Sequence, residues 1–346
     1  MSEIAKMQDL DKLKAAFLES LVLRNLSALT IRQIGQYLRV FLGYAKGRGI
    51  TEVGKVDREV FEQYKGYLST GYLTRKGEAL KSNTVQARLL HVKKWFAWMR
   101  KKGALFFDPI AEVRVPRTVK LLPKGILRTD EMRKLMELPD LGTILGYRDR
   151  TMMEVLYSTG VRAAELTSLR VPDMDLKKKV ARVRNGKGGK DRFVPLSTPC
   201  CRFLDRYIKE MRPKLAQCLR PSGRDWTKKA GTGEDFVFLS LYGGPLSKVW
   251  LGAVMKRYLH QAGITRPVSP VHSFRHSVAT HLLADGMDVR YVQVLLGHSS
   301  INSTQIYTHV ERETLQRLIK EHHPRALARD VVQPFMDQEE EAHATA

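Results

Sequence analysis

The sequence predicts a mainly helical protein with a small antiparallel β-sheet, divided into two domains. The chain has 346 residues, which is enough for two domains of ordinary size. Apolar residues recur at helical spacing over most of its length, and two short β-rich runs flank the segment NGKGGKD. We expect a helical domain over 1–117, an extended linker over 118–127, a second domain over 128–326 and a disordered acidic tail over 327–346.

The first domain is expected to consist of helices. Their apolar periodicity appears in the segments 10–46, which holds two helices, 57–69 and 82–102. Ser27 is positioned to cap the second helix of the first segment, and Ser82 or Asn83 to cap the last helix.

The last of these helices combines apolar positions with a basic face. Arg88, Lys93 and Lys94 lie on that face, and a basic amphipathic helix can lie along the phosphates of a nucleic acid. Trp95 and Trp98 are better explained as core residues than as part of a binding surface.

The second domain is predicted to be helical around a β-hairpin. The β-rich runs 179–184 and 192–196 form the hairpin, and its glycine-rich tip carries Lys187 and Lys190. The glycine and basic residues of 213–234 suggest a surface insertion. One expected helix begins at Thr129, and the next spans 148–169 with a break at Ser158-Thr159-Gly160. Two more helices are expected over 199–211 and 246–262. From Pro270 the chain is expected to be helical with breaks at Gly286 and Gly297.

Charge and composition restrict the classes of function. Lys and Arg number 59 against 36 Asp and Glu, a net charge of +23, and the excess is present in both predicted domains. Such a charge favours nucleic acid or an anionic membrane surface as the partner, although a generally basic solvated surface is the plain alternative. The sequence has no apolar run of membrane-spanning length and no secretory h-region, and its three cysteines form no C-x-x-C pair. We therefore expect a soluble, cytoplasmic, DNA-binding protein.

Several scattered side chains suit chemistry on a phosphodiester. His272 and Arg275 are three residues apart on a predicted helix and share a face, a pattern that is weak on its own. Arg162 follows the Gly160 break, Lys187 lies at the hairpin tip, and His298 follows the break at Gly297. Tyr307 lies in the next predicted helix, where a tyrosine is ordinarily a core residue.

As a set, these residues fit phosphoryl transfer. Arginines and histidines can stabilise the negative charge that develops on the non-bridging oxygens, and Tyr307 can act as a covalent nucleophile. The leaving oxygen needs a general acid, for which Lys187 is the mobile candidate. The sequence shows no metal-ligand cluster, and GKGGK lacks the spacing of an ATP-binding loop. A mechanism without metal or cofactor is expected.

Longer motifs around these residues resemble the tyrosine recombinases, also called the phage integrase family, and especially their Xer subgroup. The resemblance covers roughly residues 124–326, while the first domain is more weakly similar to the helical core-binding domain of the family. Its motifs are STGVRAAELTSLRVPDMD, NGKGGKDRFVPL, VHSFRHSVATHLLADGMDVRYVQVLLGHSSINSTQIYTHV and KEHHPRA.

The resemblance implies a role for each of these residues. Arg162 and Arg275 would clamp the scissile phosphate, and His298 would donate a hydrogen bond to it. Lys187 would protonate the leaving 5′ oxygen. His272 would act as general acid and base toward Tyr307, which would form a 3′-phosphotyrosyl bond. The implied supporting residue is Glu165, and His276, His281 and His309 nearby are expected to be structural.

The resemblance also implies partners, which are double-stranded DNA with specific recombination sites and further subunits. The subunits would form a tetramer on DNA or pair with a related recombinase. We expect DNA contacts from Arg88, Lys93, Lys94 and Lys190. The apolar residues Leu315, Leu318 and Ile319 would dock on a neighbouring subunit or pack on their own domain.

The sequence departs from the family pattern at three places. Ile34 stands where related domains often have tyrosine, the spacing between Arg162 and His272 is lengthened by the 213–234 insertion, and the acidic tail is extra. A type IB topoisomerase, a DNA-binding relative without activity and a basic interaction protein remain alternatives. Chromosome-dimer resolution and integration of a mobile element both remain open as biological roles.

Overall fold

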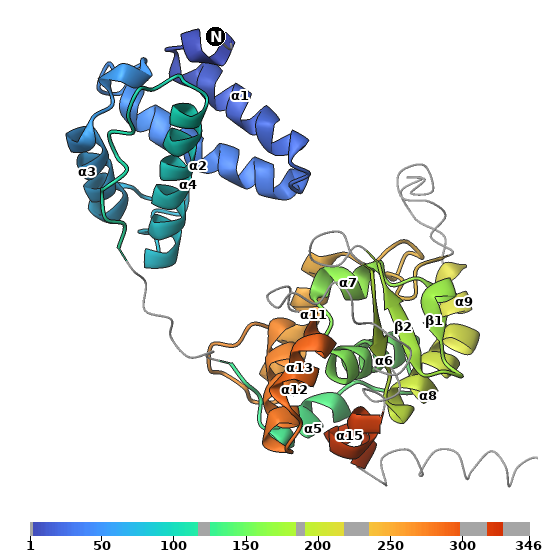
Figure 1. Ribbon diagram of the computed structural model, residues 1–346. Coiled ribbons are helices and arrows are strands. Elements are labelled where there is room, and N and C mark those ends of the chain that lie inside the picture. Colours follow the sequence, from blue (N-terminus) through green and yellow to red (C-terminus); the bar gives the residue numbers. More distant parts are fainter. Residues whose placement is uncertain (1–2, 117–124, 185–190, 218–234, 298–316, 328–346) are drawn as a thin grey trace, which may run out of the picture. The chain divides into compact units, whose positions relative to one another are not determined.

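The computed structural model describes residues 3–116, 125–184, 191–217, 235–297 and 317–327. The chain forms two compact units, Met1–Leu121 and Leu122–Ala346 (Figure 1). The described residues form a mainly helical fold with one small antiparallel sheet, as the sequence predicts. No helix in the described ranges is both long and apolar enough to cross a membrane.

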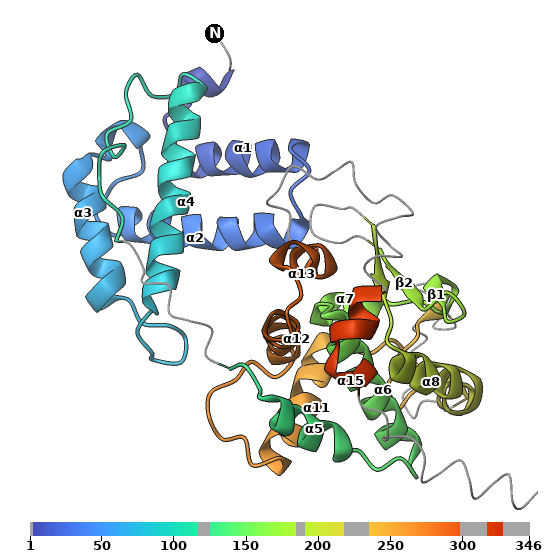
Figure 2. The ribbon, with the colours of Figure 1, turned by 60° about the horizontal axis from the view of Figure 1, so that its bottom comes forward.

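The first unit is built from helices. The α-helices are α1 (Leu10–Leu23), α2 (Ala28–Lys46), α3 (Arg58–Gly66) and α4 (Ser82–Lys101), joined by the short helical segments η1 (Glu3–Lys6), η2 (Val53–Lys55) and η3 (Tyr67–Gly71). α1, α2 and α4 pack against one another, and α4 crosses the other two (Figure 2). Phe41 and Trp95 are fully buried between them, and Trp98 is nearly so, which confirms their prediction as core residues.

The helix caps of the first unit test two predictions. Ser27 caps α2 by accepting a hydrogen bond from the backbone nitrogen of Thr30, as expected. The prediction for α4 was wrong, because its N-cap is Lys81, which makes no side-chain capping bond. Ser82 is therefore the first residue of the helix and cannot occupy the extended cap position.

The second unit is organised around α6 (Ile144–Thr159). Every residue from Gly146 to Thr159 is buried, since α5 (Thr129–Glu137), α7 (Ala163–Ser168), α8 (Thr198–Arg206) and α12 (His272–Ala284) all pack on it. The remaining helical segments are η4 (Val171–Asp173), η5 (Tyr207–Met211), α9 (Arg212–Ala216), α11 (Lys248–Gln261), α13 (Val289–Leu296), residues 317–322 and α15 (Pro324–Leu327).

The sheet has three antiparallel strands in the order β1–β2–β3. β2 (Val180–Val183) and β3 (Arg192–Pro195) form the predicted hairpin, with Ala181 opposite Val194. β1 (Met174–Asp175) was not predicted, because two residues carry no detectable alternation. The hairpin tip, 185–190, lies outside the described residues.

The predicted insertion begins later than expected. Residues 213–216 belong to α9, and Leu215 is buried in the core of the second unit, so the first part of the predicted loop is helical. The rest of it, 218–234, and the acidic tail, 328–346, lie outside the described residues.

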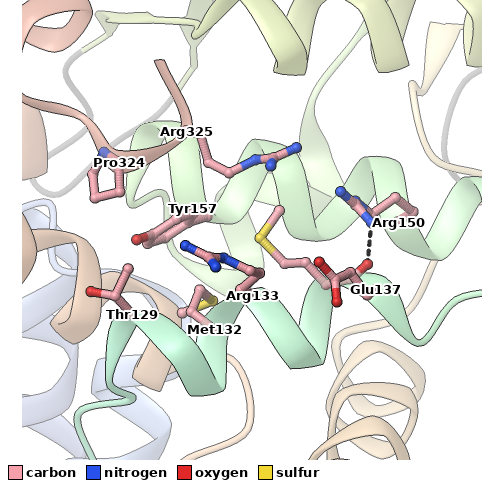
Figure 3. Close-up of a pocket in the computed structure, with 9 residues that line it drawn as sticks. Thr129, Met132, Arg133, Glu137, Arg150, Tyr157, Pro324 and Arg325 are labelled. Carbon is pink, nitrogen blue, oxygen red and sulfur yellow. Dashed lines mark hydrogen bonds between the residues drawn. The ribbon is translucent and has the colours of Figure 1, made fainter. Parts of the chain in front are cut away.

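The end of the described chain packs on its own unit. Ile319 is buried in the core of the second unit, which favours the second of the two predicted positions for this residue. His323 and Arg325 are also buried, and Figure 3 shows Pro324 and Arg325 beside Tyr157 and residues of α5 around a small pocket. Leu315 lies outside the described residues.

Candidate active site

Four of the eight site residues predicted in the second unit lie in the described part of the chain. Arg162 and Glu165 belong to the start of α7, and His272 and Arg275 to the first turn of α12. The other four predicted residues are Lys187, Lys190, His298 and Tyr307, which lie outside the described residues.

Arg275 is held between two helix ends. Its Nη1 donates a 2.7 Å hydrogen bond to the carbonyl oxygen of Gly160, and its Nη2 donates a 2.6 Å bond to that of Leu296. The residue is 8% exposed. A guanidinium has five N–H donors, so three remain after these two bonds to described residues. Arg275 is thus fixed in orientation while keeping donors for an anion.

Both helix ends depend on glycine. Gly160 ends α6 with φ 61° and Gly297 ends α13 with φ 64°, a backbone conformation that residues with a side chain rarely adopt. A Cβ atom at Gly160 would lie 2.7 Å from Cδ2 of Leu296. The two breaks predicted from the sequence therefore bring the chain close enough for Arg275 to bind both turns.

Arg162 is anchored by Glu165. The backbone nitrogen of Arg162 donates to Oε2 of Glu165 at 2.8 Å, and its Nη1 donates to Oε1 at 2.9 Å. Glu165 lies three residues into α7, where a carboxylate commonly caps the helix start. The Arg162 side chain keeps 28% of its surface exposed, so it is accessible to a ligand.

Arg192 is a site residue that the sequence reasoning missed. It is the first residue of β3, it is 8% exposed, and its Nη1 and Nη2 donate 2.9 Å bonds to the two oxygens of Glu165. An arginine in the apolar run RFVPL was the available signal, because a buried arginine needs a carboxylate partner. The partner, Glu165, lies 27 residues earlier in the chain.

The cluster is strongly positive. Burial raises the pKa of Glu165, but hydrogen bonds from Arg192 and from the backbone of Arg162 outweigh burial and lower it to about 2. Burial, together with the positive charges of Arg162 and Arg192, lowers the pKa of Arg275 to about 10. Two guanidinium groups therefore bind one carboxylate, and a third, that of Arg275, lies within reach of their charges. The excess positive charge favours a bound anion.

Two histidines extend from the same end of α12. His272 and His276 are both exposed and lie one turn apart. Burial and the neighbouring His272 and Arg275 lower the pKa of His276. The structural role expected for His276 stays a prediction.

His281, in contrast, is structural as expected. Its ring bonds to the hydroxyl of Tyr157 at 2.8 Å and to the carbonyl oxygen of Leu127 at 2.9 Å. His309 lies outside the described residues.

The basic face of α4 has three different environments. The Arg88 guanidinium lies 4.4 Å from the centre of the Tyr72 ring, and its Nε and Nη1 are buried without a hydrogen-bond partner among the residues that the structure describes. Lys93 donates to the carbonyl oxygens of Ala111 and Val113, at 2.7 and 2.6 Å. Lys94 is exposed in a shallow groove that Arg100 and Arg114 also line.

A helical unit with a small sheet and an arginine cluster suited to a phosphodiester defines a class of DNA-processing enzyme, and the comparisons identify the family. The phage integrase family matches residues 126–314. Tyrosine recombinase XerC 2 of Ralstonia nicotianae is 36% identical over 92% of this chain and 87% of that protein. Tyrosine recombinase XerD of Listeria monocytogenes is 36% identical over 90% of this chain and 98% of its own length.

The chain belongs to the phage integrase family and is a tyrosine recombinase, a site-specific enzyme that cleaves and rejoins DNA. Solved structures share its fold. XerH bound to difH substrate before cleavage has a TM-score of 0.58 at 21% identity, covering 88% of this chain and 81% of that one. A λ integrase tetramer bound to a Holliday junction has a TM-score of 0.59 at 17% identity, covering 87% and 81%.

Proposed function

We propose that six residues of this chain carry out strand cleavage and rejoining, namely Arg162, Lys187, His272, Arg275, His298 and Tyr307. The observation that carries the proposal is the arginine cluster, in which the charges of Arg162 and Arg192 act on Arg275. Two of these guanidinium groups, those of Arg162 and Arg192, bind the single carboxylate of Glu165, which leaves the cluster with an excess of positive charge. That excess suits a phosphodiester, which is singly negative and gains charge on its non-bridging oxygens during reaction.

The reaction follows from the chemistry of these groups. The phenol oxygen of Tyr307 attacks phosphorus, its proton passes to His272, and the bond from phosphorus to the 5′ oxygen breaks. Lys187 donates a proton to that oxygen, which leaves as a 5′ hydroxyl. The phosphoryl group remains on Tyr307 at the 3′ end. Attack by a 5′ hydroxyl of another strand reverses these steps and releases the tyrosine.

Arg162, Arg275 and His298 would act on the phosphate itself. Their N–H groups would bind the non-bridging oxygens, and each well-placed donor contributes about 10²–10³ in rate. Arg275 is supported in this role by its bonds to Gly160 and Leu296, which fix the guanidinium before DNA binds. A preorganised donor needs no rearrangement during the reaction.

Double-stranded DNA is the proposed partner, bound by a tetramer of this chain or by this chain with a related recombinase. The solved relatives include recombinases bound to DNA, among them a tetramer on a Holliday junction. We assign DNA contacts to Arg88, Lys93, Lys94 and Lys190. Exposure of Lys94 in the groove of α4 supports this assignment.

Covalent capture tests the proposal. The full chain is incubated with a library of nicked duplexes of randomised sequence. Because the strand is nicked, cleavage releases a short fragment that diffuses away, and religation is prevented. The expected result is a denaturant-resistant adduct with a narrow set of sequences. Tyr307→Phe should abolish it, and Arg162→Ala should slow its formation by about 10²–10³-fold.

Two outcomes would contradict the proposal. An adduct that persists in Tyr307→Phe would show that another residue is the nucleophile. Adducts without sequence preference, accompanied by relaxation of supercoiled plasmid, would instead indicate a topoisomerase. Mapping the adducts on genomic DNA would distinguish one chromosomal site, as dimer resolution requires, from the ends of a mobile element.

A further inference from the structure

The Glu165 carboxylate is shared between two arginines. Oε1 accepts bonds from Nη1 of Arg162 and Nη1 of Arg192, and Oε2 accepts from the backbone nitrogen of Arg162 and Nη2 of Arg192. Glu165 as a whole is 6% exposed. Its lone pairs are therefore filled by protein donors, and half of these donors come from Arg192.

Arg192 decides how much positive charge Arg162 offers to a ligand. With Arg192 present, two guanidiniums share one carboxylate and the trio carries a net positive charge. Without it, Arg162 is the one side chain among the described residues that still donates to the buried carboxylate, and the charges of this pair cancel. Arg162 would also be drawn toward the carboxylate, because a buried anion is costly unless its hydrogen bonds are made.

Arg192 also lies against the turn that ends α13. A Cβ atom placed on Gly297 would approach Nε, Cδ and Cζ of Arg192 to within 2.9–3.2 Å. Nε is buried and has no hydrogen-bond partner among the described residues. The guanidinium thus fills the space beneath Gly297, whose turn also supplies the Leu296 carbonyl that Arg275 binds.

We propose that Arg192 is a positioning residue of the phosphate site, a role that rests on the proposed cleavage function. It neutralises Glu165, so that Arg162 keeps its charge and its place beside Arg275. Both Nη atoms of Arg192 donate to Glu165, so the role assigned to Arg192 is to hold that carboxylate. Loss of a residue that orients the ligands of a metal site typically lowers activity by about 10- to 100-fold, and we expect a loss of similar size here.

The test compares charged and uncharged scissile groups. Full-length wild type and Arg192→Gln react in single turnover with a captured nicked duplex that carries either a phosphodiester or a methylphosphonate at the cleavage position. We expect Arg192→Gln to slow phosphodiester cleavage by about 10- to 100-fold and methylphosphonate cleavage much less, because a neutral group has less need of the cation on Arg162. A purely structural role would slow both reactions equally.

Arg182→Gln is the matched control. Arg182 lies on the neighbouring strand β2 and pairs with Asp191 at 2.7 Å, so the substitution removes the same charge and one ion pair outside the cluster. We expect its phosphodiester and methylphosphonate rates to keep the wild-type ratio. The proposal would be overturned if the ratio of phosphodiester to methylphosphonate cleavage rates were the same for Arg192→Gln as for Arg182→Gln.

A second variant tests the mechanism by rescue. Glu165→Gln removes the charge that Arg192 neutralises, so the double variant Glu165→Gln/Arg192→Gln should cleave the phosphodiester faster than Arg192→Gln alone. Failure of this rescue, with thermal unfolding showing both proteins folded, would also overturn the proposal. If Arg192→Gln does not fold, Arg192→Lys is used in its place. We then expect the ratio of phosphodiester to methylphosphonate cleavage rates to fall below that of wild type, but by less than for Arg192→Gln. Absence of any adduct from wild type would count against the proposed function instead.

Discussion

Arg275 binds the carbonyl oxygen of Gly160 through a 2.7 Å hydrogen bond from Nη1, across 115 residues of sequence. The bond joins the first turn of α12 to the end of α6, the buried helix at the centre of the second unit. One arginine therefore connects the core of the unit to the proposed phosphate site, and a change at Gly160 should affect both.

Gly160→Ala is expected to destabilise the protein and to slow cleavage. Alanine is strained at φ 61°, and its Cβ would lie 2.7 Å from Leu296 Cδ2. We expect a loss of about 2–4 kcal/mol in the free energy of unfolding, measured in urea. Adduct formation should slow even at temperatures where the variant is folded, because the carbonyl that orients Arg275 is displaced.

Gly286→Ala provides the control for backbone strain alone. Gly286 has φ 90°, but a Cβ there would meet no atom within 4 Å. The expected loss is about 1 kcal/mol with an unchanged rate of adduct formation. Equal losses in the two variants would show that the contact with Leu296 contributes nothing.

The sequence could predict the local features of this site but not its long-range contacts. The breaks at Gly160 and Gly297 follow from the local pattern, and both were found as left-handed helix ends. Arg192 was missed because its burial depends on its ion pair with Glu165. The residues next to Arg192 and Glu165 in the sequence give no sign that the two side chains pair. A helix register or a turn is fixed within a few residues, whereas an ion pair across 27 residues is fixed by the fold.

Glu154 forms a second buried cluster, away from the phosphate site. The fully buried carboxylate accepts bonds from Nε of Arg150 at 3.0 Å and from Nε of Arg325 at 3.1 Å. Glu154→Gln would remove the carboxylate charge that two buried guanidiniums share. We expect a loss of about 3 kcal/mol in the free energy of unfolding.

Glu210→Gln is the exposed counterpart of that substitution. Glu210 pairs with Arg206 at 3.0 Å on the surface, where solvent screens the charges. The expected loss is below about 0.5 kcal/mol. If urea unfolding gave similar losses for the two variants, the C-terminal residues would not be anchored as described.

His323 should make stability depend on pH. Burial lowers its pKa from 6.5 to about 4, while Nε2 donates to the Tyr157 carbonyl and Nδ1 accepts from the backbone of Arg325, as a neutral ring requires. Below pH 6.5 the unfolded chain gains a proton that the folded chain does not bind until about pH 4. Stability is therefore lost as pH falls through this window, by about 2 kcal/mol at pH 5.

His323→Gln isolates this contribution. Glutamine keeps one donor and one acceptor but does not titrate. The variant is expected to be less stable than wild type at pH 7.5 and to lose about 2 kcal/mol less than wild type between pH 7.5 and pH 5, as measured by urea unfolding at each pH. A loss equal to that of wild type would assign the pH dependence to other groups.

Lys94 should contribute to DNA affinity through counterion release. Its side chain is exposed in the basic groove of α4, so contact with a phosphate would displace a condensed cation. Lys94→Gln is expected to reduce the slope of log affinity against log salt concentration by about 0.9, with little change in sequence preference. Fluorescence anisotropy with the captured duplex at several salt concentrations measures this slope.

Lys55→Gln serves as the comparison, since Lys55 pairs with Glu52 away from the groove. An equal change of slope in both variants would mean that α4 does not lie along the DNA backbone.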